Sequence, residues 1–232
     1  MPAPQSHNRL LSSLSSADFR LLQPDLEPVT LALRHVLERP NRRVEAVYFP
    51  EAGFASVVAV QANGTKVEVG LIGREGMSGL TILLGNHRSP HSTYMQSAGR
   101  GQRIGVVKFR EAMNASASLH GVLLKYVQAF MVQTAHTAIA NARTKLDQRL
   151  ARWLLMAHDR LDGDRLSLTH EFLSLMLGVR RAGVTEALRA LVTEKLISSA
   201  RSEIVVLDRK RLERRAGESY GTPEAELRRL LG

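Results

Sequence analysis

Cysteine is absent from the 232-residue sequence. This absence excludes disulfides, thiolate zinc sites, cysteine nucleophiles and cysteine-held iron–sulfur clusters. No run of apolar residues approaches the ~18 that a membrane helix needs, and the opening segment "MPAPQSHNRLLSS" lacks the layout of a secretory signal. Proline is also absent between Pro90 and Pro223. We therefore expect a cytoplasmic protein that has no membrane partner.

Basic residues are in excess, with 32 Lys+Arg against 22 Asp+Glu and a formal net charge of +10. Such an excess favours polyanionic partners, because phosphates attract it and counterion release drives binding. The excess is spread over the chain: residues 1–144 hold 15 basic and 9 acidic groups (net +6), and residues 145–232 hold 17 and 13 (net +4). Charge alone therefore does not locate a nucleic-acid site.

The first half of the chain has the pattern of a small β domain. Residues 8–20 first indicate one short amphipathic helix, and short apolar runs broken by turn residues then extend from about Leu26 to Ile104. In "FASVVAVQANGTKVEVGLIG", Asn63-Gly64 separates two strand-like runs, which is a strong hairpin signal. Further glycines, Gly99 among them, predict more turns, so the region indicates a small barrel or roll.

A helical pattern begins after about Lys108 and continues for some fifty residues. Its apolar positions advance by three or four and form a stripe on one helix face. Such a stripe packs either on the β domain of the same chain or against a second copy. We favour a dimer contact, because the segment is longer than a roll of this size covers. The predicted dimer interface consists of Leu119, Leu123, Tyr126, Phe130, Thr134 and Thr137.

The segment "LTHEFLSLMLGVRRAGVTEALRAL" predicts a helix-turn-helix. Thr169 is a good helix N-cap, and Gly178 can end the first helix in the left-handed conformation. The second helix is expected to begin near Ala182 and to bury its apolar face. The inward-facing residues are Val184, Ala187, Leu188 and Leu191.

Arg180 and Arg181 stand at the start of that second helix, where the helix dipole opposes positive charge. A phosphate or a guanine edge would offset the cost. The alternative is a solvated face on an ordinary helical hairpin. Two β-like runs after the helix, joined by Ser199–Ser202, predict a wing that brings Arg201 to a DNA backbone. The predicted DNA-contacting residues are Thr169, His170, Arg180, Arg181, Thr185, Glu186, Arg189 and Arg201.

The sequence resembles the Crp/Fnr family of bacterial transcription regulators over nearly the whole chain. The resemblance is carried by the helix-turn-helix segment "LTHEFLSLMLGVRRAGVTEALRAL", by "RLARWLLMAHDRL" and by "VEVGLIGREGMSGL". The resemblance implies an α+β fold with a cyclic-nucleotide-binding-like β roll, a long dimerisation helix and a C-terminal winged helix-turn-helix. It also implies a homodimer, a palindromic double-stranded DNA operator and RNA polymerase as a partner. The expected divisions are a sensor roll (1–108), the dimerisation helix and hinge (109–144), the winged domain (145–217) and a tail (218–232).

The sequence departs from the family at positions that matter for binding. Arg181 matches the family's guanine-reading arginine, but Ala182 replaces the glutamate that follows it, and Glu186 stands where a third reading residue is often arginine. In the roll, Met77 follows Gly76 where cyclic-AMP-binding members have a ribose-binding glutamate. Methionine cannot accept hydroxyl hydrogen bonds as a carboxylate does. We therefore expect a changed base preference and no cyclic AMP binding.

No cofactor is identifiable in the sequence. One branch of the family binds haem, so haem held by a histidine ligand is an alternative. We interpret His87 and His91 as loop residues rather than metal ligands. The chain shows no Ser–His–Asp set, paired carboxylates or P-loop, so we expect a regulator and not an enzyme. The alternative is an effector-binding signalling module whose winged domain contacts protein. The effector, the operator sequence and the sign of regulation are not readable from the sequence.

Overall fold

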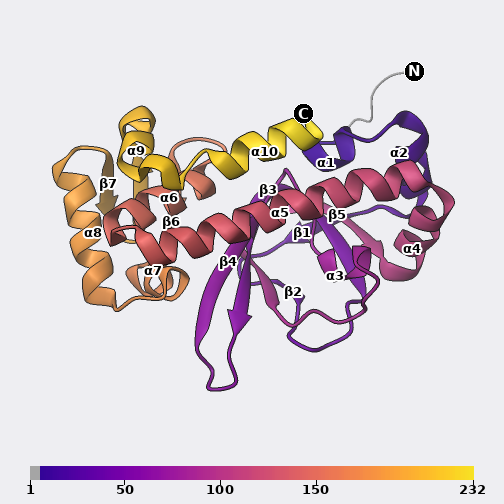
Figure 1. Cartoon of the computed structure of the whole chain (residues 1–232), viewed down its shortest axis with the longest axis horizontal. Helices are drawn as coiled ribbons and strands as arrows, with labels where there is room; N and C mark the ends of the chain where they lie inside the picture. The colour runs from indigo at the N-terminus through magenta and orange to yellow at the C-terminus, as the bar shows by residue number, and fades with distance from the viewer. Residues whose placement is uncertain (1–5) are drawn as a thin grey trace.

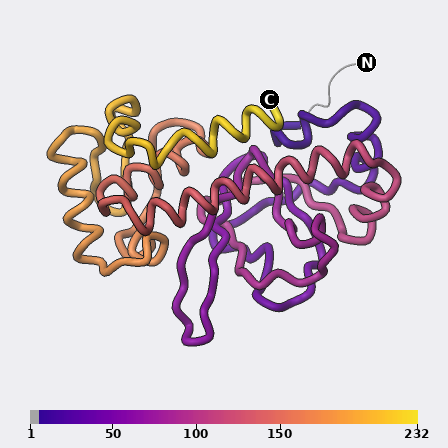
Figure 2. Tube along the Cα trace, in the orientation of Figure 1, coloured from indigo at the N-terminus to yellow at the C-terminus, as the bar shows by residue number. Residues whose placement is uncertain are grey.

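The computed structural model describes residues 6–232. A β roll occupies the N-terminal half, the long helix α5 (Ala117–Arg143) crosses it, and a winged helix-turn-helix lies at the far end of α5 (Figure 1). The trace then returns along α5 as the C-terminal helix α10 (Thr222–Leu231), so the last helix lies beside the first half of the chain (Figure 2). The predicted α+β class and the three-part architecture are confirmed.

The roll is an antiparallel five-stranded sheet in which β1, β5, β3 and β4 are neighbours in that order and β2 pairs with β5. Its long strands β3 and β5 run side by side through several register shifts, which bend the sheet into a roll. The strands are β1 (Glu27–Leu31), β2 (Val36–Glu38), β3 (Ala46–Val60), β4 (Lys66–Ile72) and β5 (Ser92–Gly105), with the short helix α3 (Leu80–Leu83) between β4 and β5.

The predicted Asn63-Gly64 hairpin is confirmed, since β3 pairs with β4 from Val60↔Lys66 onward. Only Gly64 has a left-handed backbone (φ 83°). Asn63 contributes through its side chain, whose Oδ1 accepts a hydrogen bond from the Thr65 amide at 3.0 Å. The turn predicted at Gly99 is wrong: this residue lies inside β5, where a Cβ would approach the Ala52 carbonyl oxygen to 1.9 Å. Glycine is needed there for close strand packing.

Two helices predicted as continuous are divided by serine caps. The N-terminal segment forms α1 (Arg9–Ser12) and α2 (Ser16–Leu22), followed by the 3₁₀ turn η1 (Gln23–Asp25), because Ser15 caps the amide of Asp18. The later helical region forms α4 (Val106–Ala115) and α5, because Ser116 caps the amide of Leu119. The hydroxyls of Ser116 and Ser118 also donate to the Asp18 carboxylate, and these bonds join the two caps.

The predicted dimer stripe on α5 is wrong for four of its six residues. Leu119 and Leu123 are 0% exposed, Tyr126 is 2% exposed and Phe130 is 9% exposed, all packed in the cores of their own chain. Thr134 and Thr137 are half-buried, and their hydroxyls donate to carbonyls one turn earlier in α5. The apolar face of the roll takes up this stripe, so packing within the chain is the correct alternative.

The C-terminal half begins with α6 and carries a three-stranded sheet in the order β6-β8-β7. Its elements are α6 (Leu146–His158), β6 (Arg165–Ser167), α7 (His170–Leu177), α8 (Arg181–Thr193), β7 (Ile197–Ala200), β8 (Glu203–Val206), α9 (Arg209–Ala216) and the 3₁₀ turn η2 (Gly217–Ser219). The segment expected as the C-terminal tail (218–232) contains the end of η2 and the helix α10, which packs on α5 through Leu227 and Leu231.

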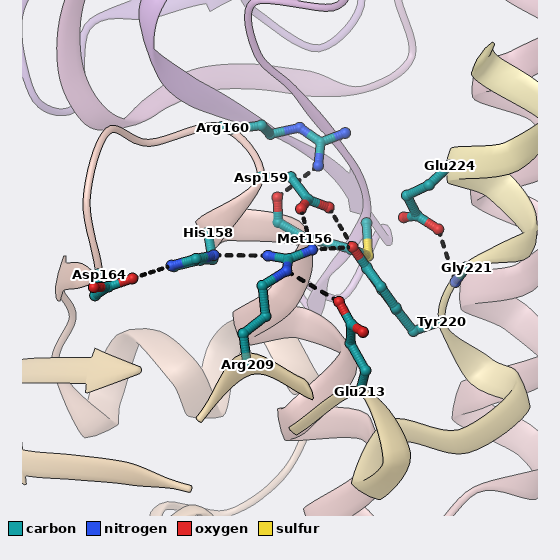
Figure 3. Close-up of polar contacts among 10 residues, drawn as sticks. All are labelled: Met156, His158, Asp159, Arg160, Asp164, Arg209, Glu213, Tyr220, Gly221 and Glu224. Carbon is teal, nitrogen blue, oxygen red and sulfur yellow. Dashed lines mark hydrogen bonds and ion pairs between the residues drawn. The ribbon is translucent and has the colours of Figure 1, made fainter. Parts of the chain in front are cut away.

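Arg209 holds the C-terminal segment to the end of α6 (Figure 3). Its guanidinium donates to Asp159 Oδ1 and to the Tyr220 hydroxyl, each at 2.7 Å, and lies 3.0 Å from Glu213 Oε1. Arg209 also lies 2.7 Å from Nδ1 of His158, whose Nε2 lies 2.8 Å from Asp164 Oδ1. These contacts join α6, the start of α9 and the approach to α10 into one unit.

The roll and the C-terminal half share one hydrophobic core. Phe54, Val58 and Leu71 of the roll pack with residues of α6, α7 and α8. Two buried polar pairs cross the same boundary: Trp153 Nε1 donates to Glu68 at 2.5 Å, and Arg160 Nη2 lies 2.7 Å from Glu75. The two halves therefore have a defined relative position, which sets what the helix-turn-helix faces. Within residues 6–232, no helix combines the length and apolarity needed to cross a membrane.

Candidate nucleic-acid interface

The helix-turn-helix is built as its local sequence predicts. The Thr169 hydroxyl accepts a hydrogen bond from the Phe172 amide at 3.1 Å and so caps α7. Gly178 ends α7 with a left-handed backbone (φ 62°, ψ 38°). Val179 packs against the core between the two helices. These contacts fix the angle at which α8 leaves the domain.

Helix α8 has a buried face and an exposed face. Val184, Ala187, Leu188 and Leu191 are at most 5% exposed, as the sequence predicted. The opposite face carries two exposed arginines before its first turn is complete: Arg180 is the N-cap residue and Arg181 the first helical residue. Glu186 and Arg189 are also exposed, one and two turns further on. The helix therefore presents donors and an acceptor outward from a rigid support.

His170 and Thr185 join the two helices of the motif. His170 Nδ1 lies 3.2 Å from Thr185 Oγ1, and the threonine hydroxyl also lies 3.1 Å from the Arg181 carbonyl oxygen. Both residues are half-buried, and Thr169 beside them is exposed. Of the predicted contact residues, His170 and Thr185 are thus already engaged within the protein, and both lie at the edge of the exposed face.

The predicted wing is present, with different strand ends. Strands β7 and β8 are joined by Arg201 and Ser202 alone, whose φ angles are 47° and 66°. Two consecutive left-handed residues form the tight hairpin turn that matches the twist of paired strands. The third strand, β6, pairs with β8 and was not predicted. Arg201 stands exposed at the tip of this hairpin.

Helix α5 also carries an exposed stripe, separate from the largely buried one, and the sequence interpretation missed it. Its positions alternate in steps of four and three, the spacing at which a helix face meets a second helix. Small residues dominate it, while Leu124 is 40% and Met131 64% exposed. We call this set the α5 seam; its members are Ala117, Gly121, Leu124, Gln128, Met131, Ala135, Ala138 and Ala142.

Side chains fill the space between α5 and the glycine-containing segment formed by the end of β4 and the residues after it. A Cβ on Gly76 would lie 2.0 Å from the Tyr126 hydroxyl oxygen, and one on Gly70 would lie 2.7 Å from Phe130. A cavity beside Tyr126, Arg160 and Glu224 has a volume of about 20 Å³. This volume is close to that of one water molecule. No group of three or more His, Asp or Glu residues within residues 6–232 is arranged to hold a metal ion.

Comparison with known proteins agrees with this architecture. Residues 148–215 match the family model of the Crp-like helix-turn-helix domain. No curated protein sequence matches the chain. Among solved structures, a protein from Eubacterium rectale assigned to the Crp/Fnr family of transcriptional regulators has a TM-score of 0.71 at 19% identity, covering 90% of this chain and 98% of that one.

Two further solved structures are similar. A Crp/Fnr family regulator from Thermus thermophilus has a TM-score of 0.66 at 21% identity over 84% of this chain and 100% of its own. The c-di-GMP-responsive global regulator of Xanthomonas campestris has a TM-score of 0.65 at 15% identity over 83% and 99%. Residues 148–215 are thus a Crp-like helix-turn-helix domain, and the whole chain has the fold of the Crp/Fnr family of transcriptional regulators.

Proposed function

We propose that the protein is a sequence-specific DNA-binding transcription regulator that acts as a homodimer. The observation that carries this proposal is the pair of exposed arginines, Arg180 and Arg181, at the positive end of α8. Packing does not account for them, whereas a guanine edge or a phosphate does. Arg181, Glu186 and Arg189 are assigned to base edges, and Arg180, Thr169 and Arg201 to the backbone. His170 and Thr185 orient the two helices and contact DNA from their exposed edge.

The α5 seam is the proposed dimer interface. Small residues allow two helices to approach closely, and Leu124 and Met131 supply the apolar contacts. Two copies related by a two-fold axis along α5 would present two α8 helices. These helices would then read half-sites ~34 Å apart, one turn of DNA. The operator is therefore expected to be a palindrome.

The roll is proposed to have lost cyclic AMP binding. Tyr126 and Phe130 occupy the space beside Gly76 and Gly70, and the cavity beside Tyr126, of about 20 Å³, is far below the ~300 Å³ of a small-molecule site. The absent ribose-binding carboxylate at Met77 points the same way. Regulation by another effector is compatible with this arrangement, and RNA polymerase is the expected protein partner at a promoter.

Selection of duplexes from a random pool tests the proposal. The full-length protein is incubated with the pool at 50 mM and at 200 mM salt, and retained duplexes are sequenced over several rounds. We expect a two-fold symmetric winner whose half-site centres are 10–10.5 base pairs apart. An unchanged pool would support the alternative, a signalling module whose winged domain contacts protein.

An Arg181→Ala variant and an Arg214→Ala variant serve as a matched pair in the same selection. Arg214 is an exposed arginine on α9. Loss of Arg181 should relax one position of each half-site, whereas loss of Arg214 should leave the selected sequence unchanged. Equal sequence preferences for both variants would remove α8 from base reading.

A further inference from the structure

The C-terminal helix α10 follows the winged domain in the sequence but packs on the other half of the molecule. Leu227 and Leu231 lie against the core that α1, α4 and α5 share with the roll. Gln128 Nε2 of α5 also donates to Glu226 Oε1 at 3.3 Å. In Figures 1 and 2 the helix runs back along α5 toward α1. The match to the family model ends at residue 215, so this returning helix lies beyond the matched domain.

Polar contacts fix the start of the same segment to the winged domain. The Tyr220 hydroxyl donates to Asp159 Oδ2 at 2.8 Å and accepts from Arg209 at 2.7 Å (Figure 3). Arg152 of α6, which is 5% exposed, donates from Nε to the Ser219 carbonyl oxygen at 2.8 Å. One end of the segment is therefore attached to the winged domain, and the other end to the roll and α5.

Two glycines frame η2 between these attachments. Gly217 has φ 60° and ψ −146°, and Gly221 has φ 108° and ψ −36°. Residues with a side chain rarely adopt either conformation, whereas glycine does so at little cost. The chain therefore has a glycine joint on each side of η2, where the direction of α10 relative to the winged domain is set.

The second attachment restricts how the winged domain can turn. Its covalent connection to α5 is short, because α5 ends at Arg143 and α6 begins at Leu146. A domain joined by one short connection can rotate about it. The contact between Glu226 and Gln128 lies 16 residues before Thr144 on α5, which is ~24 Å along a helix. An attachment at this distance opposes rotation about Thr144.

We propose that residues 217–231, which form η2 and α10, are a releasable strap that holds the winged domain against the roll and so limits DNA binding. In the strapped arrangement Lys66 of the β3–β4 hairpin lines the same hollow as Arg180 and Glu186 of the helix-turn-helix. A duplex that reached this flank of α8 would meet the hairpin, so DNA is expected to bind the released arrangement better. The effect on DNA rests on the proposed function; the strap itself does not.

Trp153, the one tryptophan of the sequence, reports whether the two halves are together. Its side chain is 3% exposed, and its indole N–H donates to Glu68 of the roll. This N–H exchanges with heavy water only when the boundary between the halves opens. Its exchange rate, followed as a single NMR signal, therefore measures that opening.

The exchange rate is compared in three full-length proteins. Leu227→Asp/Leu231→Asp removes the apolar contacts of the strap, and Thr222→Asp/Ala225→Asp makes the same change of charge at two exposed positions of α10. We expect the indole N–H to exchange about tenfold faster in the strap variant, because the burial of two leucines is lost. The control should exchange at the wild-type rate. Equal rates in all three proteins would overturn the strap.

Global stability is monitored in the same spectra through the amides of the β3–β5 ladder around Val47. These amides should keep their wild-type exchange rates. If they accelerate by the same factor as the indole N–H, the variant has lost stability throughout the protein and the proposal fails. Leu227→Ala/Leu231→Ala replaces the aspartate variant if that protein does not fold, and a smaller acceleration confined to the indole N–H is then expected.

Operator affinity is measured for the same proteins. The apparent dissociation constant falls in proportion as the binding-competent fraction rises, so the strap variant should bind about tenfold more tightly than the wild type and the control. Faster indole exchange with unchanged or weaker operator binding would refute the effect on DNA. If no operator can be selected at all, the proposed DNA function fails, while the exchange rates still decide whether α10 holds the halves together.

Discussion

The carboxyl group of Glu68 is buried where the roll meets α6, and we expect it to make the stability of the protein fall as pH rises. Glu68 is 5% exposed. Its Oε2 lies 2.5 Å from the Ser56 hydroxyl oxygen, and its Oε1 accepts from Trp153 Nε1 at 2.5 Å. Burial raises the pKa of Glu68 from 4.5 to about 7, and the hydrogen bonds from Ser56 and Trp153 and the charges of Arg152 and Arg160 only partly oppose this.

A raised carboxyl pKa means that the folded protein keeps a proton that the unfolded chain has lost. The free energy of unfolding is therefore highest below pH 4.5, falls as pH rises to about 7, and then levels off with respect to this group. The difference of 7 − 4.5 units corresponds to about 3 kcal/mol. A Glu68→Gln side chain has nearly the same shape, can donate to Ser56 and accept from Trp153, and does not titrate.

Urea unfolding at pH 5 and pH 8 measures this contribution, at one protein concentration and constant ionic strength. Between these two values, which span most but not all of the titration, the wild type should lose roughly 2–3 kcal/mol more than Glu68→Gln does. The control is Glu111→Gln, since Glu111 is an exposed carboxylate on α4 that pairs with Lys108. Parallel pH dependences for the wild type and a folded Glu68→Gln protein would refute the reasoning, as would an equal change in Glu111→Gln.

Three further predictions follow from the interfaces. Met131→Glu places a charge in the α5 seam and should halve the mass measured by light scattering at low micromolar concentration. The control Val107→Glu should leave the mass unchanged, because Val107 is as exposed (66%) as Met131 (64%) but lies outside the seam. Equal masses for both variants would remove the seam as the interface. Arg160→Met should lower the free energy of unfolding in urea by ~3–5 kcal/mol, because it leaves Glu75 buried without its partner. Adding Glu75→Gln should restore part of this free energy, and no recovery in the double variant would contradict the pairing. Arg201→Ala should weaken binding to all duplexes alike and reduce the salt slope by ~1, and a loss confined to one sequence would show base reading instead.

Local signals carried the helix-turn-helix prediction. The helix cap at Thr169, the helix end at Gly178 and the buried face of α8 each depend on residues only a few positions apart. They can therefore be predicted from local sequence alone. The same holds for the hairpin at Gly64. Serine caps are equally local, and Ser116 could have indicated the break between α4 and α5.

Features that depend on distant partners were not predictable in this way. The periodicity of Leu119 and Leu123 marked a buried stripe correctly but could not say which surface covers it, and the roll does. The α5 seam escaped notice because alanine and glycine give little hydrophobic signal. Pairing of Glu68 with Trp153 joins residues 85 positions apart, and no local pattern connects them.

The central claim, that α8 reads DNA bases, is tested most directly by binding measurements with the wild type and Arg181→Ala. Each protein is titrated with the selected operator and with operators changed at one base pair per half-site. The account predicts that the variant loses ~1–3 kcal/mol on the selected operator and nothing on the operator whose Arg181-contacted base pair has been replaced. An equal loss on every duplex, or no loss on any, would contradict the assignment of α8 as the helix that reads DNA.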